Sequence, residues 1–186
     1  MSTAAQRKVA HPRILGVGLV LTVPLILAGL TQLPVHMNRP VTAIPLPSDA
    51  DRMLLFFGYV DCPQICPTTM AALRRAHDVY TLHEATPRLT VTFVNLTEAA
   101  DGVADRYAKH FDPSFHGVQS TEQDRAALMR ELGVRFERKK DDPAGWHTDS
   151  VYVLAREGDT WNVRTVIRER PLDPDRIAEL VEDLHP

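Results

Sequence analysis

Residues 56–70 have the sequence FFGYVDCPQICPTTM, and they contain both cysteines of this 186-residue chain, Cys62 and Cys66. The stretch begins inside a continuous apolar run, residues 53–59, of the kind found in buried central strands. It ends in a helical pattern of apolar residues that continues to about residue 83. Each cysteine is followed by a proline. The pair therefore lies where the chain changes from a predicted strand to a predicted helix.

The remainder of the chain alternates predicted strands and helices, recognised by their different hydrophobic periods. Thr121 is a good N-cap for one of the helices, and Gly133 is a good residue to end it. The expected elements are strands at residues 89–96, 151–154 and 161–167, short strands near 41–44 and 134–136, and helices at 99–110, 121–132 and 173–184. This order predicts an α/β fold of thioredoxin type, with a central mixed sheet flanked by helices.

Residues 14–33 form an apolar segment without charged side chains, and Arg7, Lys8 and Arg13 precede it. About 20 helical residues cross the hydrocarbon core of a bilayer, so the segment predicts an uncleaved transmembrane anchor. A cleaved signal peptide and a buried helix are the alternatives. The positive-inside tendency places residues 1–13 in the cytoplasm. We therefore expect a single-pass membrane protein whose domain lies in the bacterial periplasm or, in a mitochondrion, in the intermembrane space.

The exported part divides into a tether and a folded domain. Residues 34–52 are rich in proline and small polar residues, which favours a tether and an irregular edge segment. Residues 53–186 are expected to form the thioredoxin-like domain. The net charge is −3, and no basic stripe indicates a nucleic-acid partner. Two cysteines are too few to scaffold a domain, and outside the cytoplasm free thiols need a thiol reductant or a metal to maintain them.

The CPxxCP segment is compatible with a metal site, a redox couple or a structural disulfide. Pro67 suits the first helical position and disfavours helical geometry at Cys66, which is therefore expected close to the N-cap. There, unpaired amides and the helix dipole would favour its thiolate. Cys62 lies in the preceding turn, and the three-residue spacing is expected to let both sulfurs turn outward. Two thiolates directed at one point suit Cu(I) or Zn(II), and the same geometry could close a disulfide.

A metal site needs a third ligand, and His147 is the best placed of the eight histidines. It falls in a predicted loop just before the strand at residues 151–154, and in a thioredoxin-type sheet that loop abuts the cysteine segment. Thioredoxin-like oxidoreductases generally have a cis-proline in this loop, but this chain has no proline between residues 144 and 170. The other histidines are better explained as helix-face, loop or tail residues: His11, His36, His77, His83, His110, His116 and His185.

Together these motifs resemble the SCO/SenC family of membrane-anchored copper chaperones for cytochrome c oxidase assembly. FFGYVDCPQICPTTM is similar to the family signature F-G-[YF]-T-x-C-P-x-x-C-P, and HTDSVYVL is similar to D-H-[ST]-x-x-x-Y-L. The strand at residues 91–96, followed by ADGVADRYAKHFDPSFHG, resembles the family's second strand, helix and H-F-x-P-x-F-x-G turn. The resemblance implies that Cys62, Cys66 and His147 bind copper, as Cu(I) in a near-trigonal site and as Cu(II) with further help.

The resemblance also implies a role in copper delivery. A chaperone of this kind, which is not itself an enzyme, would pass copper to a respiratory oxidase subunit at its CuA centre, or to another cuproprotein. The alternative is an extracytoplasmic thiol-disulfide oxidoreductase. In that case Cys62 and Cys66 are the catalytic, redox-active pair that keeps the cysteines of a copper-receiving protein reduced, and a thiol reductant is the partner.

Three departures indicate a divergent member of the family. Residues 95–100 are Asn-Leu-Thr-Glu-Ala-Ala, where the family usually has D-P-x-R-D-T. Trp146 replaces the aspartate that usually precedes the histidine. The segment before the first core strand is short and rich in proline. Any charge pairing that the D-P-x-R-D-T run provides is therefore expected to be absent here.

Overall fold

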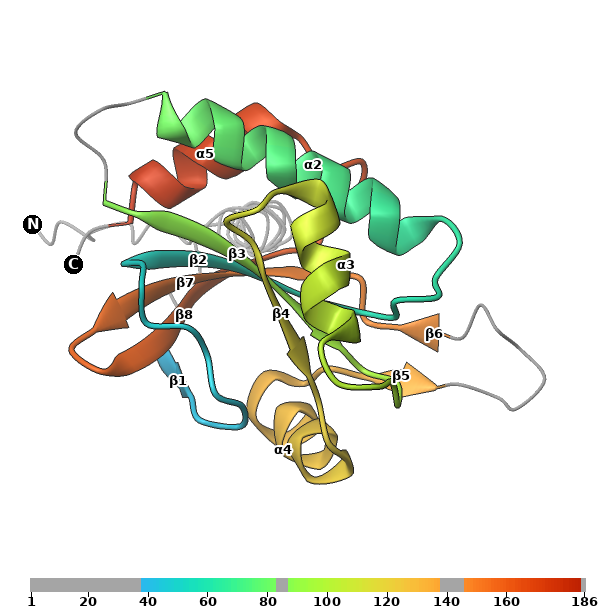
Figure 1. Ribbon diagram of the computed structural model, residues 1–186. Coiled ribbons are helices and arrows are strands. Elements are labelled where there is room, and N and C mark those ends of the chain that lie inside the picture. Colours follow the sequence, from blue (N-terminus) through green and yellow to red (C-terminus); the bar gives the residue numbers. More distant parts are fainter. Residues whose placement is uncertain (1–37, 83–86, 138–145, 185–186) are drawn as a thin grey trace, which may run out of the picture. The chain divides into compact units, whose positions relative to one another are not determined.

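A six-stranded mixed sheet lies at the centre of the computed structural model, which describes residues 38–82, 87–137 and 146–184. Its strands are β1 (Arg39–Val41), β2 (Arg52–Gly58), β3 (Leu89–Asn95), β4 (His116–Gln119), β7 (Val151–Glu157) and β8 (Thr160–Ile167). Their order across the sheet is β1-β8-β7-β2-β3-β4 (Figure 1). β3 is parallel to β2 and β4, whereas β7 is antiparallel to β2 and β8. The predicted mixed sheet is therefore confirmed.

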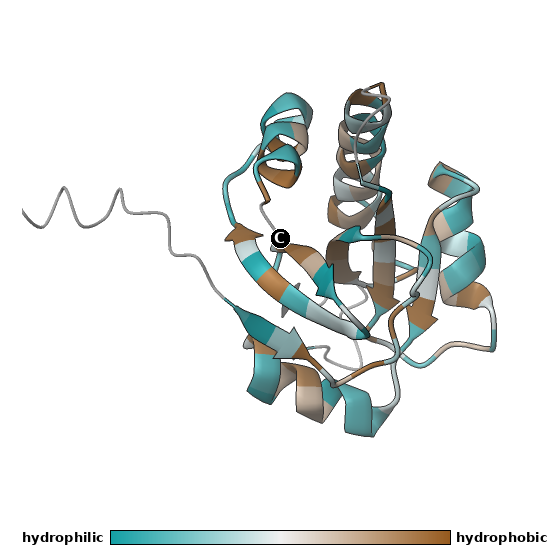
Figure 2. Ribbon diagram, turned by 90° about the vertical axis from the view of Figure 1, so that its left-hand side faces the viewer, coloured by the Kyte–Doolittle hydropathy of each residue, from teal (hydrophilic) through white to brown (hydrophobic). Residues whose placement is uncertain are grey.

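Helices cover the sheet. They are α2 (Ile65–Thr81), α3 (Val103–Phe111), α4 (Glu122–Leu132) and α5 (Pro174–Glu182). Figure 1 shows α2 and α5 side by side above the sheet and α4 below it. In Figure 2 hydrophobic residues concentrate in the central strands, while hydrophilic residues lie on the outer faces of the helices. The predicted α/β arrangement with flanking helices is thus present.

β2 owes its central position to its continuous apolar sequence. Every residue from Met53 to Phe57 in β2 is completely buried, as expected for a strand covered on both faces, whose side chains all point into the core. All seven residues of β3 are buried as well, although Thr90 and Thr92 alternate with its apolar residues. Full burial of each large apolar side chain contributes roughly 1.5–3 kcal/mol. The strand that carries the cysteines at its end is therefore held firmly in the core.

Local sequence signals set the ends of α4 as expected. Thr121 is its N-cap, and the Thr121 hydroxyl accepts a hydrogen bond from the amide of Asp124. The Asp124 carboxylate accepts one from the Thr121 amide, which completes a capping box. Gly133 ends the helix with φ 67°, a left-handed conformation that glycine adopts without strain. Asp173 caps α5 in a similar way.

Several other elements differ from the sequence prediction. α3 begins at Val103, not at residue 99, because Gly102 adopts φ 73° and starts the helix. Residues 116–119 form the edge strand β4 through parallel pairing with β3, although this short polar stretch has no strand period of its own. A two-stranded antiparallel ribbon joins β5 (Phe136–Glu137) to β6 (Trp146–His147), where a loop was expected at the histidine. Pairing between distant segments decides β4 and the ribbon, whereas the start of α3 is set locally by Gly102.

The predicted anchor at residues 14–33 lies outside the described residues. Within residues 38–82, 87–137 and 146–184, no helix is long and apolar enough to cross a membrane. The described portion of the predicted tether contributes to the domain, because Val41, Ile44 and Ala50 are buried in the hydrophobic core.

Candidate metal centre

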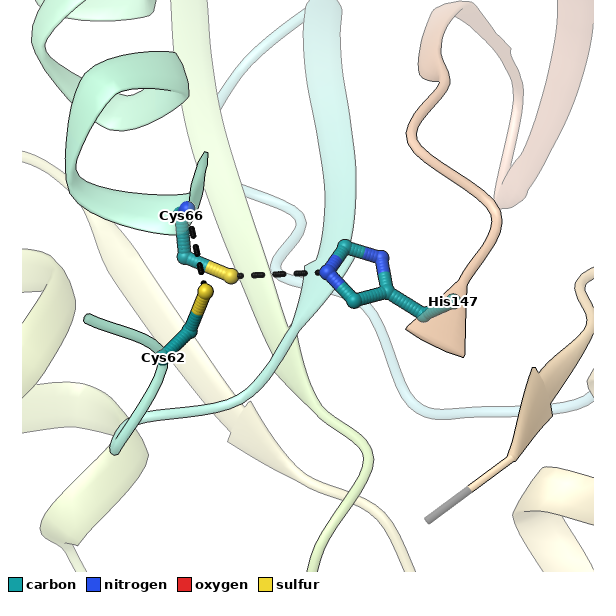
Figure 3. Close-up of side chains that lie close together, drawn as sticks. All are labelled: Cys62, Cys66 and His147. Atoms are coloured by element: carbon teal, nitrogen blue, oxygen red, sulfur yellow. Dashed lines mark hydrogen bonds between the residues drawn. The ribbon is translucent and has the colours of Figure 1, made fainter. Parts of the chain in front are cut away.

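Cys62, Cys66 and His147 come together at one point of the structure (Figure 3). The ligand atoms of these residues all lie within 4.8 Å of one another. The Sγ atom of Cys66 lies 3.6 Å from Nε2 of His147, and both cysteines are free thiols. The sequence prediction that these three side chains share a site is therefore matched by the geometry.

The cysteines reach this point because they follow the end of β2 at Gly58, with Cys62 four residues further on. A turn follows, in which the amide of Cys62 donates to the carbonyl of Tyr59 (3.1 Å), and α2 then begins. Gly58, the last residue of β2, makes room for the sulfur of Cys66. A Cβ atom at Gly58 would lie 2.6 Å from that Sγ, closer than real Cβ contacts occur. The position next to the site therefore requires glycine.

The predicted helix start at Pro67 is wrong. α2 begins at Ile65 with Gln64 as its N-cap, so Cys66 is the second helical residue and Pro67 the third. Proline is tolerated there because the first four amides of a helix have no partner inside it. The expectation that both sulfurs turn outward is also wrong, since Cys66 is completely buried and only Cys62 reaches the surface, with 9% of its area exposed.

The helix start favours the thiolate of Cys62, not that of Cys66 as the sequence suggested. Burial raises the pKa of the Cys66 thiol well above its usual value, despite the hydrogen bond from the Tyr59 amide (3.5 Å). Partial burial also raises the pKa of Cys62, but hydrogen bonds from the backbone of Cys66, Gln64 and Ile65 outweigh it and lower the pKa overall. The amide of Cys66 lies 3.5 Å from Sγ of Cys62. The two thiols are therefore chemically unequal.

His147 is oriented to present Nε2 to the sulfurs. Its Nδ1 lies 3.1 Å from the carbonyl oxygen of Thr148, which can only accept. In the neutral ring Nδ1 therefore carries the proton, and Nε2 has the free electron pair. The imidazole ring packs edge-on against Tyr59 and Phe56, with centroid separations of 5.0 and 6.1 Å. Such an outer hydrogen bond is the usual means of fixing a metal-binding histidine.

A second anchor holds the strand that carries His147. The amide of Thr148 donates to the carbonyl of Arg135 (2.7 Å), and the Thr148 hydroxyl accepts from the Arg135 amide (2.8 Å). These bonds tie the β6 end to the segment that follows α4. The histidine therefore enters the site from the small ribbon, while the cysteines enter from the main sheet and α2.

Two soft sulfur ligands and one imidazole suit Cu(I) or Zn(II). The family described as SCO1/SenC matches residues 46–184 of the chain. The chain belongs to the SCO1/SenC family. This confirms the resemblance that the motifs indicated.

Known members of the SCO1/SenC family and their structures extend the comparison. An SCO2-like protein of Rickettsia felis is 27% identical over 112 residues, which are 56% of this chain and 54% of that protein. The chain thus spans about half the length of this relative. Arabidopsis thaliana ScoI, solved with copper bound, is 21% identical with a TM-score of 0.61, over 70% of this chain and 81% of that chain. The apo Sco1 protein of Thermus thermophilus is 26% identical with a TM-score of 0.54, over 82% and 91% of the two chains. These likenesses support a thioredoxin-like Sco fold.

The described histidines other than His147 lie apart from the sulfurs. His116 lies against Asp49, with Nε2 3.1 Å from the carboxylate, and His110 packs against its neighbour on α3. His77 forms a second group of potential ligands with Asp78 and Asp112, but Nε of Arg74 lies 3.6 and 3.9 Å from the two carboxylates. The remaining four histidines fall outside the described residues: His11, His36, His83 and His185.

Three residues that support the site were not singled out from the sequence. Gly58 lies against the sulfur of Cys66, and Thr148 follows His147 and bonds to its ring. The third residue is Asn95, which is completely buried and begins the segment where this SCO1/SenC protein departs from the D-P-x-R-D-T run. The run is replaced by a neutral hydrogen-bond network in which Asn95 bonds to Thr97 and Gln119. The signal in the sequence was the departure itself, but its partners become visible only in the fold.

Proposed function

We propose that this SCO1/SenC protein is a copper metallochaperone in which Cys62, Cys66 and His147 hold the ion. The convergence of two free thiols and an imidazole Nε2 within 4.8 Å carries the proposal. Thiolates are preferred ligands of Cu(I), and an imidazole nitrogen is accepted as well. The copper-bound state of the similar Arabidopsis protein supports copper over Zn(II) as the cargo.

The unequal exposure of the ligands gives the transfer a direction. Cys62 and His147 are slightly exposed, at 9% and 8%, whereas Cys66 is completely buried. A partner with its own thiolates or thioethers therefore meets the copper ion from the side of Cys62 and His147. One ligand of this protein leaves as each partner ligand binds, and each released thiolate takes up a proton. Copper thus changes hands by ligand exchange and is never free in solution.

The recipient and the location follow from the same proposal. The recipient is a respiratory oxidase copper centre, CuA of cytochrome c oxidase, as the family resemblance implies. Residues 14–33 anchor the domain to the membrane and hold it outside the cytoplasm, which the apolar sequence and the preceding basic residues support. Sequencing the mature N-terminus after membrane fractionation tests the anchor. The CuA content of the oxidase in cells that lack the protein tests the recipient.

Copper titration of the anaerobically reduced protein tests the metal site. Cys62→Ser, Cys66→Ser and His147→Ala are expected to lose stoichiometric binding of Cu(I) or to weaken it strongly. His116→Ala is the matched control, because this histidine lies against Asp49 and away from the sulfurs. If His147→Ala binds copper as the parent does, the three-ligand site is refuted.

A thiol-disulfide oxidoreductase is the second candidate function. It is favoured by the pairing of a slightly exposed thiol of lowered pKa, Cys62, with a completely buried partner, Cys66. The Cys62 thiolate would attack a disulfide of the partner protein and form a mixed disulfide. Cys66 would lose its proton and attack the Cys62 sulfur, which releases the partner as a dithiol and leaves a Cys62–Cys66 disulfide. A thiol reductant then restores the pair with two electrons.

The same variants separate the two functions. A chaperone binds copper stoichiometrically and needs His147, whereas an oxidoreductase exchanges thiols rapidly with or without this histidine. In the oxidoreductase, Cys66→Ser accumulates a mixed disulfide through Cys62, because the resolving thiol is missing. Rapid thiol exchange by a parent protein that binds no copper would replace the chaperone with the oxidoreductase.

A further inference from the structure

Asn95, the last residue of β3, is a completely buried polar residue that bonds to three separate segments. Its Oδ1 accepts a hydrogen bond from the amide of Val60 (3.3 Å). Its Nδ2 donates to the carbonyl of Thr97 and to Oε1 of Gln119, both at 2.9 Å. One side chain thus connects the turn before Cys62, the loop after β3 and the edge strand β4.

The segment that Asn95 holds is the one that shapes the metal centre. Val60 follows Tyr59, whose ring packs against His147 and whose carbonyl accepts the amide of Cys62. The backbone amide of Tyr59 also lies 3.5 Å from Sγ of Cys66. A change in the path of residues 58–62 therefore reaches all three ligands of the site.

The network behind Asn95 is fixed on its other side. Its backbone carbonyl accepts hydrogen bonds from the amide and the hydroxyl of Ser120, at 3.2 and 2.6 Å. Nε2 of Gln119 donates to the carbonyl of Thr97 (2.6 Å), and the Thr97 hydroxyl donates to Oδ1 of Asn95 (3.1 Å). The amide of Leu96 donates to the carbonyl of Gly58 (2.9 Å). Asn95 is thus a fixed support and not a mobile side chain.

We infer that Asn95 is a positioning residue for the metal centre, which keeps Cys62 in register with Cys66 and His147 through its bond to Val60. The inference rests on the proposed copper function and adds a residue to its site. The position requires a group that accepts and donates at once. An aspartate could accept from Val60, but it has no hydrogen for Thr97 and Gln119. An apolar residue would leave the Val60 amide, the Thr97 hydroxyl and Oε1 of Gln119 without this partner in a partly buried setting.

Two readouts on full-length protein test the inference. The first is hydrogen exchange of the Val60 amide in the reduced, metal-free protein, which does not depend on copper. The second is the rate at which Cu(I) passes to an excess of a chelator. The variants are Asn95→Ala and, as a matched control, Asn162→Ala, which removes another buried asparagine whose amide bonds only to Glu157 and Thr160 among the described contacts.

In Asn95→Ala, exchange of the Val60 amide is expected to be roughly tenfold faster, the factor equivalent to one buried hydrogen bond. Exchange in the middle of β3 stays as in the parent, and Cu(I) release accelerates by about the same factor. Asn162→Ala changes neither rate. A Val60 amide that stays protected in Asn95→Ala overturns the inference. Faster exchange with unchanged Cu(I) release overturns it too, because the turn would then not position the ligands.

Gln119→Ala keeps the test open if Asn95→Ala does not fold. This side chain is half-buried on the edge strand. Its removal takes away one of the two acceptors that Nδ2 of Asn95 bonds to. A roughly threefold faster exchange at Val60 is expected, and parental exchange overturns the inference. If the unsubstituted protein binds no copper, the proposed function fails on that result alone. Hydrogen exchange of the Val60 amide still tests whether Asn95 holds the turn at residues 58–62.

Discussion

Gly58→Ala is expected to disturb the stability of the protein and its metal centre through one defined contact. The added Cβ would lie 2.6 Å from Sγ of Cys66, with Phe93 Cε2 and Phe56 Cε1 at 3.2 and 3.3 Å. Ordinary contacts begin at 3.4 Å, so the sulfur must retreat by about 0.8 Å to restore one. Metal-ligand distances are specified to about 0.2 Å, so this shift exceeds what the site tolerates.

Overpacking of this kind costs about 1–3 kcal/mol of unfolding free energy. Because the clash involves the sulfur, removing the sulfur should relieve it. In a double-mutant cycle, Gly58→Ala is therefore expected to cost at least about 1 kcal/mol less in a Cys66→Ala background than in the parent. Urea unfolding of the reduced, metal-free protein, followed by the fluorescence of buried Trp161, measures all four free energies.

Gly133→Ala is the matched control for the cycle. Its Cβ would meet no atom within 4 Å, but its φ of 67° is unfavourable for alanine. The variant should therefore be destabilised without any coupling to Cys66, and its cost should be the same in both backgrounds. Additive costs for Gly58→Ala and Cys66→Ala would refute the claim that the glycine exists to accommodate this sulfur.

Three further predictions concern the ionisable groups and the histidine strand. Cys62 should react with iodoacetamide before Cys66 near neutral pH, because Cys62 is more exposed and its pKa is lowered, whereas burial raises the pKa of Cys66. Equal labelling of the two cysteines in peptide mapping would contradict this. Burial raises the pKa of Glu131, but hydrogen bonds to its carboxylate lower it overall from 4.5, so its contribution to stability is present above pH 4.5 and is lost as the pH falls through the folded value. Glu131→Gln should therefore flatten the dependence of unfolding free energy on pH below about 4.5, and an unchanged slope in acid titration argues against it. Thr148→Val should weaken copper binding about two- to tenfold through loss of the hydroxyl bonds to Arg135, seen as faster Cu(I) loss to a chelator, with the thiols still present by quantitative labelling.

The parts that local sequence determines were predictable. The uninterrupted apolar run of β2 requires burial on both faces, and the Thr121 and Gly133 signals act within one helix turn, so neither depends on distant residues. His147 could be chosen because the order of the elements brings its segment to the end of β2. Where the outcome depended on pairing across the fold, prediction failed or was imprecise. β4 is a strand because β3 lies beside it. The helix start was a local error: Pro67 is the third helical residue and not the first, so α2 begins two residues earlier and its amides favour Cys62.

The ribbon that carries His147 has a kinetic consequence. The cysteines are attached to β2 and α2, which are part of the main core. In the described residues the ribbon pairs Phe136 with His147 and Glu137 with Trp146, and Thr148 adds its bonds to Arg135. Opening so short a ladder breaks far fewer bonds than opening a core strand, so it belongs to the low-energy end of local unfolding. We therefore expect the imidazole to leave a bound ion before either sulfur does, because its ribbon should open more easily than β2 or α2.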